Sequence, residues 1–83
     1  MSEQSPNMVA LMEHAAKALV EKPADVLVES FDEEGEIVLE LTVAEDDMGR
    51  IIGRQGRTAR ALRHLLRAAS LKTNKRYELE ILE

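Results

Sequence analysis

Residues 48–58 read Met-Gly-Arg-Ile-Ile-Gly-Arg-Gln-Gly-Arg-Thr, and this stretch decides the fold. Gly53 and Gly56 bracket two polar residues, and the apolar pair Ile51 and Ile52 precedes them. Because glycine lacks a Cβ, the backbone can turn sharply at such positions and another chain can approach closely. The stretch therefore predicts a glycine loop between two helices, and the second helix would begin with an N-terminus that suits an anion.

The helices on either side of the glycine loop can be outlined from their neighbours. A short helix is expected over residues 48–52, with Glu45, Asp46 and Asp47 as caps and Gly53 as its stop. A longer helix is expected over residues 57–70 and is divided by face. Like charges at helical spacing repel by tenths of a kilocalorie per mole per pair, which favours an anionic partner. The basic arc of this helix comprises Arg57, Arg60, Arg63, His64 and Arg67, and the apolar arc comprises Ala59, Leu62, Leu65, Leu66 and Ala69.

The first half of the chain predicts one helix and a hairpin. Ser5 as cap and Pro6 at the first position would begin a helix that covers residues 8–20 and ends before Pro23. Strands are expected over residues 26–31 and 37–43, joined by a turn in which Gly35 supplies a positive φ. The first strand has polar and apolar residues on both faces, so its sequence does not decide which face is buried. A third strand is expected over residues 76–82. The predicted helix buries Met8, Leu11, Met12, Ala15 and Leu19, and the second strand points Ile37, Leu39, Leu41 and Val43 one way.

Length and charge narrow the class of protein. We expect 83 residues to form one domain, residues 1–83, in which residues 1–6 are a flexible N-terminus. The absence of cysteine excludes a disulfide framework, a thiolate metal site and a cysteine nucleophile. The absence of cysteine also fits the cytoplasm. Neither a secretory signal nor an apolar run long enough to cross a membrane is seen. The net charge is −5, yet residues 50–76 hold nine basic residues and no acidic one, which is the footprint of a nucleic-acid-binding surface.

The predicted order is helix, strand, strand, helix, helix, strand, in an α+β fold. The first two strands would form an antiparallel hairpin, and the helical connection would place the third strand parallel to the second. This gives a three-stranded mixed sheet with three helices on one face. With Ile-Ile-Gly-x-x-Gly at residues 51–56, the chain resembles a KH domain of the type II arrangement. The whole chain is similar to the small bacterial stand-alone KH proteins of the KhpA type, most clearly over residues 18–23, 48–56 and 59–63.

The resemblance implies a non-catalytic protein that binds single-stranded RNA in a groove for about four nucleotides. Ile51, Ile52, Ala59 and Leu62 would form an apolar floor, and the third strand with residues 72–76 would form the opposite wall. Because no aromatic platform is present, we expect weak affinity for one domain, little base selectivity and compensation by dimerisation. The residues carried over as RNA-binding are Arg50, Ile51, Ile52, Gly53, Arg54, Gln55, Gly56, Arg57, Thr58, Arg60, Arg63, Lys72 and Lys75.

Other interpretations stay open beside RNA binding. The domain could mainly form a homodimer, or a heterodimer with a larger KH-containing partner, with RNA contact secondary. The same groove could hold single-stranded DNA, which the 2′-hydroxyl would decide. The glycines could be plain helix stops, and the basic arc a solvated helix face. No cofactor and no metal are expected, and His14 and His64 are expected to be too far apart for a metal site.

Overall fold

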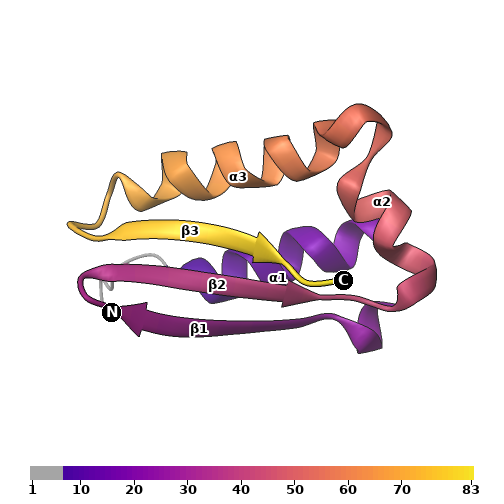
Figure 1. Cartoon of the computed structure of the whole chain (residues 1–83), viewed down its shortest axis with the longest axis horizontal. Coiled ribbons are helices and arrows are strands. Elements are labelled where there is room, and N and C mark those ends of the chain that lie inside the picture. Colours follow the sequence, from indigo (N-terminus) through magenta and orange to yellow (C-terminus); the bar gives the residue numbers. More distant parts are fainter. Residues whose placement is uncertain (1–6) are drawn as a thin grey trace.

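The computed structural model describes residues 7–83, so Ser5, Pro6 and the expected flexible N-terminus lie outside the described residues. The predicted order of elements is confirmed (Figure 1). Three single turns of 3₁₀ helix were not expected: η1 (Pro23–Asp25), η2 (Glu45–Asp47) and η3 (Arg54–Gly56). The helices and strands are α1 (Met8–Leu19), β1 (Leu27–Glu33), β2 (Glu36–Thr42), α2 (Met48–Ile52), α3 (Arg57–Ser70) and β3 (Arg76–Ile81).

The three strands form one mixed sheet in the order β1-β2-β3. β1 and β2 are antiparallel, and β3 runs parallel to β2 after the crossover through α2 and α3. The hairpin loop is the pair Glu34 and Gly35, with φ of 51° and 88°. A two-residue loop of this kind needs a positive φ at both positions, and its twist matches that of the strands. Asp32 and Glu33, expected in the turn, belong to β1 instead.

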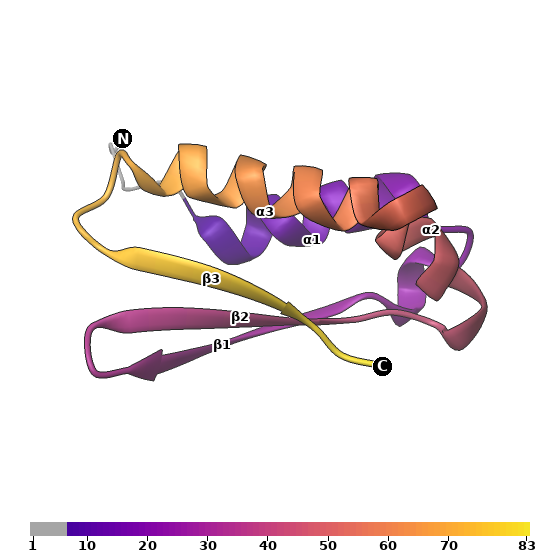
Figure 2. The ribbon, with the colours of Figure 1, turned by 45° about the horizontal axis from the view of Figure 1, so that its top comes forward.

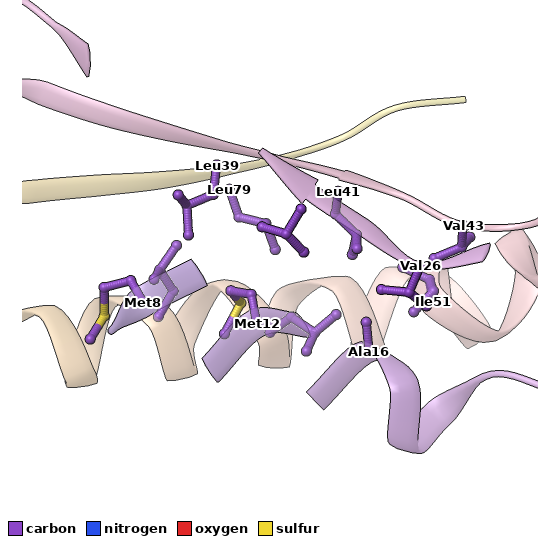
Figure 3. Close-up of a cluster of buried hydrophobic side chains, with 12 residues drawn as sticks. Met8, Met12, Ala16, Val26, Leu39, Leu41, Val43, Ile51 and Leu79 are labelled. Carbon is purple, nitrogen blue, oxygen red and sulfur yellow. The ribbon is translucent and has the colours of Figure 1, made fainter. Parts of the chain in front are cut away.

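The core lies between the sheet and the helices, which cover one face of it (Figure 2). Met8, Met12 and Ala16 follow one another at a spacing of four residues along α1, so they share a face. They project toward the sheet, where Met8 and Met12 lie on the side of Leu39 and Leu79 and Ala16 lies on the side of Leu41 (Figure 3). Each large apolar side chain so buried contributes on the order of 1.5–3 kcal/mol to folding. Val26, Val28, Leu41, Val43, Ile51, Leu62 and Leu66 complete the cluster.

The first helix differs from its prediction at both ends. Asn7 caps it, because its side-chain oxygen accepts a hydrogen bond from the Ala10 amide at 3.1 Å, so the cap is not Ser5. Leu19, expected in the core, stands in the last turn and is 41% exposed, while Ala16 is fully buried in its place. The helix ends at Leu19 because the next amides hydrogen-bond to Asp47, far along the chain.

The outer face of the sheet is acidic. Glu29, Glu40 and Glu80 are direct partners across the three strands, which places three like charges side by side. Such pairs destabilise a sheet. A hydrogen bond with the Glu78 carboxyl, together with repulsion from its charge, raises the pKa of Glu36 above its ordinary value. On the same face lie Leu27 and Phe31, both exposed, which shows that β1 buries the side that carries Val28.

Candidate nucleic-acid interface

The glycine loop is a compact structure held by its own backbone. Gly53 ends α2 with φ 78°, and its amide donates to the Gly49 carbonyl at 2.8 Å. The next residues form one 3₁₀ turn, in which the Gly56 amide donates to the Gly53 carbonyl at 3.1 Å. Gln55 and Gly56 both adopt a positive φ, of 57° and 73°. The loop is therefore already shaped before any ligand arrives.

The two glycines serve different purposes. A Cβ on Gly53 would lie 2.7 Å from the backbone nitrogen of Thr58 and collide with its side chain. Gly53 is therefore required by the fold itself, to let the loop close against the start of α3. A Cβ on Gly56 would meet no atom of the described residues within 4 Å, although its left-handed φ still favours glycine. The space over Gly56 is thus open, directly at the N-terminus of α3.

The basic arc of α3 is exposed along its whole length. Arg57 Nη2 donates to the Gln55 side-chain oxygen at 3.3 Å, and Arg60 Nη2 lies 3.5 Å from the Gln55 carbonyl oxygen. Arg63 Nε donates to the Leu79 carbonyl at 3.4 Å, so this arc borders β3. The expected division of the helix is confirmed except at Leu65, which is 41% exposed.

Arg50 is held in ion pairs. Its guanidinium contacts Asp47 Oδ1 at 3.2 Å and Glu21 Oε2 at 3.0 Å. These contacts fasten α2 to the end of α1. Much of the charge of Arg50 is therefore balanced within the protein, and Arg50 is less available to a phosphate than Arg54 or Arg57.

Asp47 is a structural anchor, and the expectation that it caps α2 is wrong. It forms no side-chain cap at α2 and is almost fully buried. Its carboxylate accepts hydrogen bonds from the Glu21 amide at 3.1 Å and the Lys22 amide at 3.0 Å. These amide hydrogen bonds, reinforced by the charge of Arg50, hold the pKa of Asp47 below its ordinary value. The charged carboxylate thus ties the entry of α2 to the connection between α1 and β1.

A groove of about 890 Å³ runs between α2 and the ends of β2 and β3. Ile52 lines it, whereas Ile51, Ala59 and Leu62 are buried and do not line it, so only Ile52 of the four residues expected in the apolar floor is brought to this groove. Sequence reasoning missed Met48 and Gly49, although Met48 and Ile52 stand four residues apart and so share a helix face. The groove is lined by Thr42, Val43, Glu45, Met48, Gly49, Ile52, Leu82 and Glu83.

Lys72 and Lys75 are not brought together with the glycine loop. They follow the C-terminal end of α3, at the opposite end of this helix from the glycine loop (Figure 1). The 14 residues of α3 span about 21 Å. Lys75 borders a separate hollow of about 320 Å³ beside Arg67 and Arg76. The wall opposite α2 is therefore formed by Leu82 and Glu83 and not by residues 72–76.

Within residues 7–83, no three His, Asp or Glu side chains are grouped so that they could hold a metal ion. None of the helices in that range has the length and apolar character needed to cross a membrane.

The family model described as "KhpA/KhpB, KH domain" matches residues 9–81. The chain belongs to this family. The expected α+β fold of a single KH domain is thereby confirmed, with the mixed sheet and three helices described above. KH domains of this family are non-catalytic, and the similar curated proteins are named as RNA-binding proteins, so the expectation that the chain is not an enzyme is also confirmed.

The similar curated proteins match almost end to end. The RNA-binding protein KhpA of Halalkalibacterium halodurans is 47% identical over 76 residues, which cover 92% of this chain and 100% of that protein. The protein of the same name from Clostridium perfringens is 48% identical over 75 residues, covering 90% and 100%. That from Borreliella burgdorferi is 47% identical over 77 residues, covering 93% and 94%.

The fold also resembles that of part of a solved structure. A variant of Era from Aquifex aeolicus, crystallised with GDP and AlF4⁻, superposes with a TM-score of 0.63 at 20% identity. The match covers 89% of this chain and 29% of that one. At this identity the likeness shows a common fold and nothing about activity.

Proposed function

We propose that this chain binds single-stranded RNA, with the glycine loop and the basic arc of α3 on the sugar-phosphate backbone and the groove beside α2 on the bases. One observation carries the proposal: a preformed glycine loop, an open helix N-terminus and an apolar groove lie next to one another. The names of the similar proteins support it. Arg54, Gln55 and Arg57 are exposed at this junction, where a phosphate would lie.

The proposed binding of the sugar-phosphate backbone is mainly electrostatic. The N-terminus of a helix carries about half a positive charge, and Gly56 leaves the space above it open. Arg57 and Arg60 add full charges within the first turn of α3. The bases would meet Met48 and Ile52, which offer apolar contact without an aromatic ring. Stacking on an aromatic contributes roughly 1–3 kcal/mol per base, so one domain alone is expected to bind weakly.

The dependence of RNA affinity on salt concentration should test this electrostatic contribution directly. With about four phosphates contacted, the logarithm of the binding constant for a single strand should fall with a slope near −3 against the logarithm of salt concentration. That corresponds to a loss of about 50-fold in affinity between 50 and 200 mM salt. The measurement is fluorescence anisotropy of a labelled, unstructured RNA octamer.

Two competitors complete the salt experiment. A DNA octamer of the same sequence tests whether the 2′-hydroxyl is read, and an RNA duplex tests whether the strand must be unpaired. Tighter binding of the single RNA strand than of both competitors supports the proposal. A salt-independent affinity, or equal competition by the duplex, would contradict it.

We further propose a post-transcriptional regulatory or RNA-chaperone role in a bacterial cytoplasm. Its basis is the weak affinity expected for the sugar-phosphate backbone, which would suit many RNAs rather than one. Cross-linking and sequencing of bound RNA from cells would identify the targets. The matching sample comes from cells that carry a variant of the glycine loop.

We also propose that the domain pairs with a second copy, or with a larger KH-containing partner, through the outer surface of α1 and α3. A hollow of about 600 Å³ lies between these helices, next to Met8, Leu11 and Ala69. Leu65 stands one turn before Ala69 and is 41% exposed. This surface is apolar and lies away from the groove, so pairing would leave the RNA site free and join two weak sites.

The variant Leu65→Glu is expected to shift a dimer to monomer by placing a charge in this apolar surface, while the fold survives because Leu65 is already partly exposed. Sedimentation equilibrium over a concentration series measures the change. Leu27→Glu is the control, because Leu27 is 50% exposed on the opposite face of the molecule. A parent chain that stays monomeric at high concentration, or equal loss of dimer in both variants, would rule out this surface.

A further inference from the structure

The groove beside α2 contains charges of the wrong sign for RNA. Glu45 lines it from the turn that enters α2, and Glu83 lines it from the segment that leaves β3. Neither carboxylate forms an ion pair with any residue of the described range. None of the cations of residues 50–76 lines the groove with them. Two residues with unpaired carboxylates therefore line the place that the bases would occupy.

A carboxylate near a phosphate chain opposes binding, because like charges repel most strongly where water is partly excluded. The same carboxylate becomes favourable when a base donates a hydrogen bond to it. An ionised carboxylate only accepts hydrogen bonds, so it discriminates between base edges that donate and edges that accept. A carboxylate that lines the groove can therefore add a modest preference for bases that donate a hydrogen bond to it.

We propose that Glu45, together with Glu83, sets a base preference in which cytosine, adenine and guanine are favoured over uracil. This inference rests on the proposed function. Cytosine and adenine present an exocyclic amino group that can donate to a carboxylate, and Glu or Asp is a known acceptor for the cytosine amino group. Guanine also carries an amino group. Uracil has no exocyclic amino group and places a carbonyl oxygen where cytosine has its amino group, so only its N3–H can donate to a carboxylate, and O4 is repelled by it.

The shape of the groove lets a base reach these carboxylates. Gly49 follows Glu45 by one helical turn, and a Cβ there would meet no atom of the described residues within 4 Å. A glycine inside a helix costs about 1 kcal/mol relative to alanine, and here no close packing within the fold requires it. The open space over Gly49 therefore leaves a path between Glu45 and the apolar side chains of Met48 and Ile52.

The neighbouring Asp46 provides a matched control. It belongs to the same 3₁₀ turn and carries the same charge near the start of α2. It does not line the groove, and it pairs with Lys22 Nζ at 3.2 Å. Any general effect of a negative charge in this turn should therefore appear equally in Asp46→Asn and Glu45→Gln.

The test compares an octamer of alternating cytidine and adenosine with an octamer of uridine, both fluorescently labelled. We expect the parent to bind the first octamer about tenfold more tightly, the equivalent of one well-placed hydrogen bond to a base. Glu45→Gln should reduce this ratio at least threefold, mainly by strengthening the uridine complex, since an amide can donate to the uracil carbonyl. Glu45→Gln with Glu83→Gln should reduce it further.

The outcomes separate this inference from the function on which it rests. An unchanged ratio in Glu45→Gln, a parent that prefers uridine, or an equal change in Asp46→Asn would overturn the base preference. In each of those cases RNA still binds and the proposed function stands. Failure of the parent to bind either octamer would instead overturn the proposed function and this inference with it. A reduced ratio in Glu45→Gln alone supports both.

Discussion

Changing Arg54 and Gln55 together to aspartate is expected to weaken the binding of single-stranded RNA by about 100-fold or more. The substitution removes one exposed cation and places two anions where the backbone phosphate would lie. A hydrogen bond to a charged group contributes about 1.5–3 kcal/mol, and a factor of ten corresponds to about 1.4 kcal/mol. The fold should survive, because both side chains are exposed and Asp tolerates the left-handed conformation of Gln55.

The control for this loop variant carries the same change of net charge on another part of the surface. Lys17→Asp with Asn74→Asp also lowers the charge by three, and neither of these exposed side chains lines the groove or the hollow between α1 and α3. Anisotropy with the RNA octamer measures binding, and far-ultraviolet circular dichroism checks the fold. If the loop variant binds as tightly as the parent at physiological salt, or if the control loses as much affinity, the glycine loop is not the phosphate site.

Gly53→Ala is expected to lower the free energy of unfolding by about 2–5 kcal/mol. The left-handed backbone costs about 1–3 kcal/mol for a residue with a side chain, and the collision with Thr58 adds a similar amount. A domain of this size has roughly 5–10 kcal/mol to lose. The midpoint of thermal unfolding should therefore fall by about 10 °C or more, measured by circular dichroism.

The variant Gly56→Ala introduces backbone strain without a steric collision, so it distinguishes the two effects. Its φ of 73° makes alanine unfavourable by about 1 kcal/mol, but the new Cβ meets open space. This variant should stay folded and yet bind RNA more weakly, because the Cβ occupies the place left for the phosphate. Equal loss of stability in the two alanine variants would show that Gly53 is not held against Thr58 as described.

Much of the fold could be predicted because its signals are local. The helix α3 begins and ends where its period predicts, since Gly56 precedes it and the apolar and basic arcs persist over 14 residues. Leu65 was misplaced because it lies at the margin of the apolar arc, where only the neighbouring helix decides exposure. Asp47 was misread for a stronger reason. Its partners, the amides of Glu21 and Lys22, are 26 and 25 residues away, so no local pattern could reveal them.

In the candidate site, too, the parts that are contiguous in sequence could be predicted and the others could not. The glycine loop and the basic arc are contiguous in sequence, and residues 53–57 predict both. The groove is not contiguous, because Thr42, Met48 and Leu82 come from three separate elements that meet only in the folded chain. Lys72 and Lys75 show the converse error. They belong to the basic segment by sequence, yet the length of α3 carries them to the far end of the molecule.

The row of Glu29, Glu40 and Glu80 on the outer face of the sheet bears on how fast a partner is captured. The protein is acidic on average, with a net charge of −5, and this row of glutamates lies on the outer face of the sheet, whereas the basic arc of α3 lies on the side that the helices cover. A molecule with such a charge separation orients itself in the field of an approaching polyanion, and correctly oriented encounters become more frequent. Productive orientations would thus be favoured before any contact forms. The repulsion among the three glutamates lowers the stability of the fold, but the resulting charge distribution would raise the rate of association with RNA.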